Sequence, residues 1–224
     1  MPEVIFNGPA GRLEGRYQPA ADKSAPIAMN RHPLPQLGGT MNNKIIYDLV
    51  YLFQKRGFTT LRFNFRSIGR SQGDFDHGVG ELSDAASALD WIQSLHPESK
   101  SCWIAGSSFG AWIGMQLLMR RPEIEGFMSI APQPNTYDFA FLAPCPSSGL
   151  ISHGSEDRVA PPSAVQGLVD KLHLQKGILI TQKTMEGANH FFEGQEEELL
   201  DNCAEYLDAR LRGELVPEVV KKLR

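Results

Sequence analysis

The chain has 224 residues, of which 42% are hydrophobic and 21% charged, a composition typical of a soluble globular domain that buries its own core. Its 22 basic and 26 acidic residues give a net charge of −4, and no basic run is present, which argues against nucleic acid as a partner. No stretch is long and apolar enough to cross a bilayer, which argues against a membrane partner.

Strand and helix patterns alternate along the chain. Residues 3–6 and 12–17 alternate in polarity on either side of a turn cluster, which predicts an antiparallel hairpin. Further strands are expected at 26–30, 58–65, 102–105, 126–131, 148–153 and 177–184. Helices are expected at 42–56, 81–95, 111–120, 161–174 and 195–211. This alternation indicates a mostly parallel sheet covered on both faces, with catalytic residues on loops beyond the carboxyl ends of the strands.

The segment 101–114, SCWIAGSSFGAWIG, joins an expected strand to an expected helix. Gly106 and Gly110 stand two places on either side of Ser108, which makes the G-x-S-x-G pattern of a nucleophile elbow. Such a turn is so tight that side chains at the two flanking positions would collide. It places the serine hydroxyl at the start of a helix, where backbone N–H groups favour negative charge. Ser107 is the rival nucleophile, but it lacks the symmetric glycines.

A serine nucleophile needs a base to take its proton and a carboxylate to orient that base. In the α/β-hydrolase fold these residues follow one another in the order serine, acid, histidine. Ser108, Asp157 in HGSEDRVAP and His190 in GANHF meet this order, and each follows an expected strand. We therefore predict an α/β-hydrolase fold of about eight strands. Asp157 would hold His190 in the right tautomer, and His190 would act as general base and then as general acid.

The oxyanion hole is expected to consist of two backbone amides. One is the amide of Phe109, directly after the nucleophile, and the other lies in the loop 32–40. We assign the second to Leu34, because its neighbours Pro33 and Pro35 have no N–H to donate.

Each of the three triad residues has a structural alternative. Ser108 could be a structural serine in a tight turn, Asp157 could cap the following helix, and His190 could be a loop histidine. Glu156 is the alternative acid, although it is one residue out of register with the expected spacing. His32, before the oxyanion loop, fits a packing and hydrogen-bonding role better than a chemical one.

Five segments together resemble a bacterial family of α/β-hydrolases that is itself similar to dienelactone hydrolases in size and layout. They are HPLPQLGGTMNN (32–43), FRSIGRSQG (65–73), GSSFG (106–110), HGSEDRVAP (153–161) and GANHF (187–191), and the likeness covers nearly the whole chain. The resemblance implies the fold but little about the substrate.

The chain departs from the family pattern at two positions. The family's loop usually reads His-Pro-His-Pro, and this chain has Leu34 at the second histidine; a backbone amide survives that change, whereas a side-chain role does not. The family also tends to have Arg-Gly where this chain has Arg66 and Ser67. Dienelactone hydrolases use a cysteine nucleophile, so Ser108 argues against that specific activity.

Only the segment 132–146 is available to form a lid, so we expect a shallow, open pocket roofed by Tyr137, Phe139 and Phe141. Such a pocket favours a small-molecule acyl substrate, such as a short ester, thioester or lactone, cleaved through a Ser108 acyl-enzyme. Two alternatives stay open. A serine peptidase or amidase uses the same triad, and a non-catalytic protein could keep the fold to bind a partner, although it would not need all three triad residues.

The remaining expectations concern location, cofactors and assembly. The N-terminal sequence lacks the basic and long apolar regions of a signal peptide, so we expect a cytoplasmic protein. The three cysteines lack C-x-x-C spacing, which argues against a disulfide framework or a zinc site. We expect a single domain over 1–224 with no metal and no organic cofactor. Its tail, 213–224, has apolar residues that would suit docking on a second copy as a homodimer: Val216, Val219, Val220 and Leu223.

Overall fold

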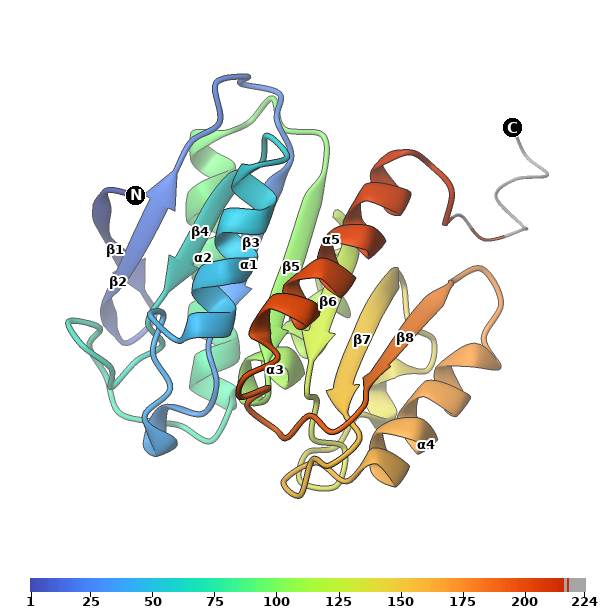
Figure 1. Cartoon of the computed structure of the whole chain (residues 1–224). Coiled ribbons are helices and arrows are strands. Elements are labelled where there is room, and N and C mark those ends of the chain that lie inside the picture. Colours follow the sequence, from blue (N-terminus) through green and yellow to red (C-terminus); the bar gives the residue numbers. More distant parts are fainter. Residues whose placement is uncertain (216, 218–224) are drawn as a thin grey trace.

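Eight strands form one sheet in the computed structural model, which describes residues 1–215 and 217 (Figure 1). The strands are β1 (Glu3–Gly8), β2 (Gly11–Gln18), β3 (Ile27–Arg31), β4 (Thr59–Phe63), β5 (Cys102–Ser107), β6 (Ile124–Ile130), β7 (Ser148–Gly154) and β8 (Ile180–Met185). Their order across the sheet is β1-β2-β4-β3-β5-β6-β7-β8. The six strands from β3 to β8 run parallel, whereas β2 is antiparallel to both of its neighbours. The predicted fold class and the N-terminal hairpin are therefore confirmed.

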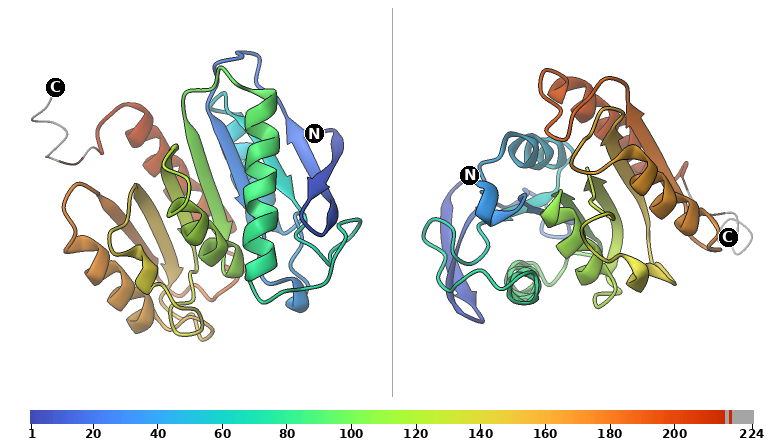
Figure 2. Two further views of the ribbon diagram at one scale, coloured as in Figure 1. Left: turned by 180° about the vertical axis from the view of Figure 1, so that it is seen from behind. Right: turned by 90° about the horizontal axis from the view of Figure 1, so that it is seen from below.

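Five α-helices cover the two faces of the sheet. They are α1 (Lys44–Gln54), α2 (Val79–Leu95), α3 (Phe109–Leu118), α4 (Pro162–His173) and α5 (Glu196–Leu211). Helices α1 and α5 lie on one face, and α2, α3 and α4 lie on the other (Figures 1 and 2). Short 3-10 helices at η1 (Pro35–Leu37) and η2 (Ala140–Leu142) interrupt two of the loops.

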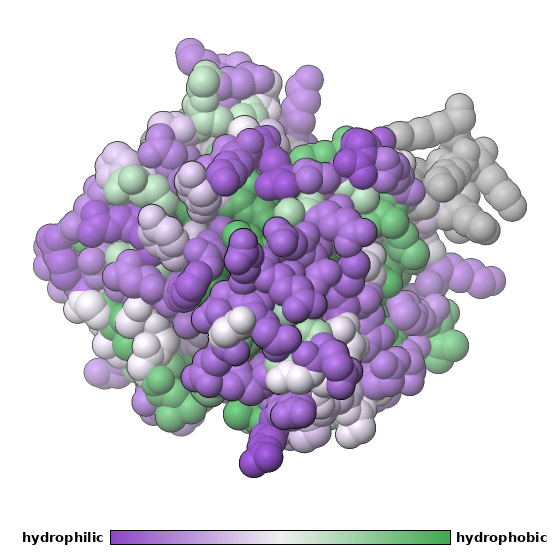
Figure 3. All heavy atoms as spheres, in the orientation of Figure 1, coloured by the Kyte–Doolittle hydropathy of each residue, from purple (hydrophilic) through white to green (hydrophobic). Residues whose placement is uncertain are grey.

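The two faces of the sheet bury separate apolar clusters because a strand directs successive side chains to opposite sides. Met29 and Phe127 belong to the cluster under α2, α3 and α4, whereas Ala28 and Met128 belong to the cluster under α1 and α5. The outer surface over α1 and α5 is mostly hydrophilic, with scattered apolar residues (Figure 3).

The start of helix α1 is fixed by local sequence, and its first residues line the pocket that contains Ser108. The side chain of Asn43 accepts hydrogen bonds from the backbone N–H groups of Ile45 and Ile46, at 3.1 and 3.4 Å, and so caps the helix. Its apolar residues recur at helical spacing, and Ile46 and Phe53 are fully buried against the sheet. The N-terminus of α1 is thereby held at the carboxyl edge of the parallel strands.

Some element boundaries differ from the sequence prediction. Strand β8 begins at Ile180 rather than at 177, because Gly177 has a φ of +87° and turns the chain before the strand. Helix α3 begins at Phe109, immediately after Ser108, two residues earlier than expected.

The expected docking residues Val216, Val219, Val220 and Leu223 lie outside the described residues. Among residues 1–215 and 217, no helix combines the length and apolar character that a membrane crossing requires.

Candidate active site

The chain turns sharply between β5 and α3, and Ser108 occupies the turn with φ +56° and ψ −118°. A positive φ is strained for a residue with a side chain, and such strain is concentrated at functional sites. A Cβ atom at Gly106 would lie 2.5 Å from the carbonyl oxygen of Gly110, and one at Gly110 would lie 2.5 Å from that of Arg31. Both neighbours are backbone atoms, so glycine is needed at both positions of the turn.

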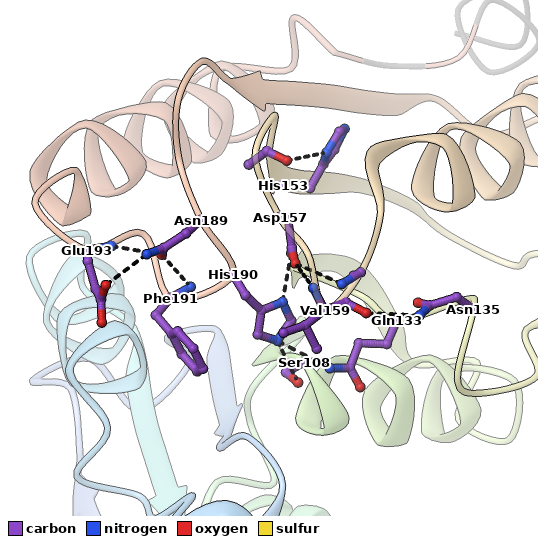
Figure 4. Close-up of polar contacts among 12 residues, drawn as sticks. Ser108, Gln133, Asn135, His153, Asp157, Val159, Asn189, His190, Phe191 and Glu193 are labelled. Carbon is purple, nitrogen blue, oxygen red and sulfur yellow. Dashed lines mark hydrogen bonds and ion pairs between the residues drawn. The ribbon is translucent and has the colours of Figure 1, made fainter.

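Three side chains from three loops meet at the carboxyl edge of the sheet (Figure 4). Nε2 of His190 lies 3.2 Å from Oγ of Ser108, and Nδ1 of His190 lies 2.7 Å from Oδ2 of Asp157. Because a carboxylate only accepts, Nδ1 carries the proton and Nε2 presents its lone pair to the serine. All three side chains are buried, so these hydrogen bonds are shielded from water.

The carboxylate of Asp157 has a second set of partners. Its Oδ1 accepts hydrogen bonds from the backbone N–H groups of Val159 and Ala160, both at 2.8 Å (Figure 4). These bonds fix the carboxylate, so its other oxygen is aimed at His190. The neighbouring Glu156 is exposed to solvent and does not take this place.

The loops carrying Asp157 and His190 are joined directly through their backbones. The N–H of Glu156 donates to the carbonyl oxygen of Ala188 at 3.0 Å. A Cβ atom at Gly154 would lie 2.1 Å from the same oxygen, so the approach requires glycine there. The side chain of Asn189 then holds the next turn, because its Oδ1 accepts from the N–H of Phe191 at 2.9 Å.

The two amides expected to form the oxyanion hole lie close to the nucleophile in the fold. Phe109 is the first residue of α3, directly after Ser108, and Leu34 lines the same pocket as Ser108. No hydrogen bond between described residues uses the backbone N–H of Phe109 or of Leu34. Both amides are therefore available to a ligand.

His32 anchors the loop that contains Leu34. Its Nε2 accepts the N–H of Phe65 at 3.1 Å, and its Nδ1 donates to the carbonyl oxygen of Pro33 at 2.7 Å. Burial lowers the pKa of His32 to about 4, so the ring is neutral at pH 7. The structure thus gives His32 the packing and hydrogen-bonding role that its position suggests.

A pocket of about 470 Å³ opens above Ser108 and His190. Its apolar lining includes Leu34, Ile45 and the ring of Tyr137, and several other lining residues are polar. These polar residues are Asn43, Lys44, Ser107, Gln133, Thr136, Glu193 and Glu196.

The aromatic roof differs from the sequence prediction, since only Tyr137 lines the pocket. Phe139 is buried in the core and Phe141 packs against it, with their ring centroids 6.0 Å apart, and neither lines the pocket. Tyr137 stacks on Trp112 with the ring centroids 4.5 Å apart, which fixes its position. The structure therefore does not support Phe139 and Phe141 as substrate contacts, because Phe139 is buried in the core and the half-buried Phe141 packs against it.

Sequence reasoning missed Gln133, whose Nε2 lies 3.3 Å from Nε2 of His190 (Figure 4). It also missed the contribution of α1 to the pocket through Asn43, Lys44 and Ile45. A usable signal for Gln133 existed: it is a polar residue shortly after the carboxyl end of β6, where catalytic side chains collect in parallel sheets.

The metal-ligand and thiol side chains of the described residues lie as follows. Residues 1–215 and 217 hold no cluster of three or more His, Cys, Asp or Glu side chains arranged to bind a metal ion. Burial raises the pKa values of the Cys102 and Cys203 thiols to about 12. A thiolate nucleophile at either position is therefore disfavoured at neutral pH.

Comparison with known proteins identifies the family to which this chain belongs. The family model described as X-Pro dipeptidyl-peptidase (S15 family) matches residues 15–143, which include Ser108 but not Asp157 or His190. An uncharacterized protein of Rickettsia prowazekii is 49% identical over 211 residues, which cover 92% of this chain and 89% of that protein.

Solved structures of similar proteins cover nearly the whole chain. A protein of unknown function from Agrobacterium tumefaciens, assigned to the α/β hydrolases, has 79% identity and a TM-score of 0.95 and covers 96% of this chain and 99% of its own. An α/β serine hydrolase without a lid from Xanthomonas campestris has 30% identity and a TM-score of 0.83, with 94% of each chain covered. The chain therefore belongs to the S15 family of X-Pro dipeptidyl-peptidases as that model defines it, and it is a serine hydrolase of the α/β-hydrolase fold.

Proposed function

We propose that this protein hydrolyses a small ester, thioester or lactone through an acyl-enzyme on Ser108. The observation that carries the proposal is the unbroken chain of hydrogen bonds from Asp157 through His190 to the strained Ser108 at the floor of a pocket. This arrangement supplies a nucleophile, a base and the group that orients the base.

The proposed reaction has two halves. In the first, Oγ of Ser108 attacks the acyl carbon while Nε2 of His190 takes its proton, and the negative oxygen accepts from the amides of Phe109 and Leu34. The leaving group takes the proton from His190 as its bond to the acyl carbon breaks. In the second half, water attacks the acyl carbon with His190 again as base, and Ser108 is regenerated.

The pocket supports a small acyl substrate. Its volume of about 470 Å³ lies toward the low end of the range for small-molecule sites, roughly 300–1,000 Å³. The side chains of Leu34 and Ile45 offer apolar surface beside the nucleophile, where an acyl chain would bury its CH₂ groups. We propose that the leaving group lies toward His190, which must protonate it.

A peptidase is the second candidate, because the matching family is described by an X-Pro dipeptidyl-peptidase activity. The pocket also contains the carboxylates of Glu193 and Glu196, which would suit the α-ammonium group of a peptide. Amide cleavage requires the same Ser108 chemistry, so the two candidates differ in the leaving group and in how the far end of the pocket is used.

The first test is labelling with a fluorophosphonate, which reacts with an activated serine whatever the substrate. We expect the wild-type protein to be labelled at pH 7.5, Ser108→Ala to lose the label, and Ser83→Ala, at a half-buried position of α2, to keep it. Labelling that persists in Ser108→Ala but vanishes in Ser107→Ala would contradict the assignment. A folded wild-type protein that takes no label would favour a non-catalytic binding role.

Substrate preference then separates the two enzymatic candidates. We expect p-nitrophenyl acetate and butyrate to be hydrolysed faster than an Xaa-Pro-p-nitroanilide at equal concentration. The opposite order, together with loss of p-nitroanilide cleavage in Glu193→Gln, would select the peptidase.

A further inference from the structure

Gln133 is a buried polar side chain that touches the catalytic base but has no part in the triad. It follows β6 and is 7% exposed, and its Nε2 lies 3.3 Å from Nε2 of His190. No hydrogen bond between described residues uses its Oε1, and the residue lines the pocket. The carboxamide therefore joins the base to the space that a reacting molecule would occupy (Figure 4).

The single lone pair on Nε2 of His190 has two competing donors. Nδ1 carries the ring proton and donates it in a hydrogen bond to Asp157, so Nε2 can only accept in the resting state. The hydroxyl of Ser108 lies 3.2 Å away and the amide of Gln133 3.3 Å away. Gln133 thus lies beside the same nitrogen that a water molecule must reach in order to lose a proton to it.

Backbone hydrogen bonds hold the loop that carries Gln133 in one conformation. The carbonyl oxygen of Gln133 accepts the N–H groups of Thr136 and Tyr137, at 3.0 and 2.9 Å. Two residues earlier, the buried Ala131 has a φ of +45°, a strained value for a residue with a side chain.

A closed ring of contacts ties this loop to the triad. Nδ2 of Asn135 donates to the carbonyl oxygen of Val159 at 2.9 Å, and the N–H of Val159 donates to Asp157. The ring returns through His190 to Gln133, so the carboxamide is positioned by the same network that positions the base (Figure 4).

We propose that Gln133 binds and orients the water molecule that hydrolyses the acyl-enzyme. The inference rests on the proposed function, because it assumes the acyl-enzyme on Ser108 and the base His190. A carboxamide suits this task because it offers N–H donors and a carbonyl acceptor to the same water molecule. Once the acyl group is attached, Oγ of Ser108 has no proton, and the water molecule that Gln133 holds replaces it as a donor to Nε2.

The step balances as follows. The oxygen of the water molecule forms a bond to the acyl carbon, and its proton passes to Nε2 of His190. The tetrahedral intermediate then breaks its bond to Oγ of Ser108, and Oγ recovers the proton from His190. The products are a carboxylic acid and the free enzyme, and no further reactant is required.

Acylation and deacylation should respond differently to loss of the carboxamide. Gln133→Met keeps the length of the side chain but removes both hydrogen-bonding groups. The hydroxyl of Ser108 then no longer competes with Gln133 as a donor to Nε2 of His190. Fluorophosphonate labelling should therefore proceed at the wild-type rate or faster. Deacylation loses an oriented water molecule, so steady-state hydrolysis of p-nitrophenyl acetate should fall about tenfold, the effect of one hydrogen bond to a reacting group.

The experiment measures labelling rate, steady-state turnover and the stopped-flow burst of p-nitrophenol for wild type, Gln133→Met and Gln133→Asn. Gln133→Asn keeps the carboxamide but withdraws it by one CH₂ group, and it should show the same split to a smaller extent. Gln166→Met, the same substitution at an exposed position of α4, is the matched control and should match the wild type. Circular dichroism checks that each variant is folded.

For Gln133→Met we expect retained labelling and a burst approaching one equivalent of p-nitrophenol. Added hydroxylamine should restore turnover, since this nucleophile attacks the acyl-enzyme without needing an oriented water molecule. Labelling and turnover that fall together, or that both stay unchanged, would overturn the role of Gln133. Absence of wild-type labelling would overturn the proposed function and this inference with it.

Discussion

Nε of Arg31 donates a hydrogen bond of 3.1 Å to the carbonyl oxygen of Gly110, so a buried guanidinium lies directly against the turn that carries Ser108. Among the described residues no carboxylate lies within ion-pair distance of Arg31, and its Nη1 has no hydrogen-bond partner. Burial accordingly lowers the pKa of Arg31 to about 9. A charge that is buried without a counter-charge costs stability.

We therefore expect Arg31→Met, which keeps most of the side-chain volume, to raise the free energy of unfolding at pH 7 by about 1–2 kcal/mol. The unfolded wild-type chain binds more protons than the folded one above pH 9, so wild-type stability rises there and the gain should shrink by pH 10. Urea unfolding at both pH values tests this. A loss of stability at pH 7 would show that the hydrogen bond to Gly110 outweighs the buried charge.

Gly110 should not tolerate a side chain. A Cβ atom there would lie 2.5 Å from the carbonyl oxygens of both Arg31 and His32. Both are backbone atoms, which cannot move aside as the end of a flexible side chain can. We expect Gly110→Ala to cost roughly 1–3 kcal/mol of stability and to reduce fluorophosphonate labelling by displacing Ser108.

The matched control for Gly110→Ala is Gly167→Ala at an exposed position of α4, where nothing lies within 4 Å of the added Cβ atom. Alanine favours a helix over glycine, so this variant should be about 1 kcal/mol more stable and fully labelled. Equal effects of the two substitutions would argue against the tight elbow.

Ser67 has a φ of +68°, in the left-handed region that favours glycine, and it is exposed. A residue with a side chain adopts this conformation only at an energetic cost. We expect Ser67→Gly to raise the free energy of unfolding by about 1 kcal/mol, measured by calorimetry. Ser83→Gly within α2 should lower it, because glycine weakens a helix. A destabilised Ser67→Gly would mean that the hydroxyl makes a contribution greater than the strain.

His32 should make the folded state sensitive to acid. Its pKa is lowered to about 4 by burial, whereas an unfolded histidine titrates near 6.5, so the unfolded chain binds the extra proton first. Stability from this residue is therefore complete above about pH 6.5 and is lost as the pH falls toward 4, by about 3 kcal/mol in all.

Urea unfolding of wild type and His32→Gln between pH 7 and pH 4.5 measures this contribution. Glutamine can keep the acceptor for the N–H of Phe65 without titrating, so its stability should decline less over that range. Parallel declines in the two proteins would remove His32 from the acid response.

Several features of the fold and site followed from local sequence. The alternation of strands and helices, the glycines around Ser108 and the chain order of Ser108, Asp157 and His190 are properties of short segments. Hydrophobic period, turn chemistry and the order of the motifs do not depend on distant contacts, so they can be read before the chain folds.

Other features required the packed structure. The sequence pattern does not distinguish Tyr137, which lines the pocket, from Phe139, which is buried in the core. Nor does it place Gln133 beside His190, because that distance depends on how two loops meet at the sheet edge. The sequence by itself determined the parallel sheet and the residues of the candidate triad, whereas sheet register and packing between loops decided which further side chains surround them, since those contacts join residues far apart in the chain.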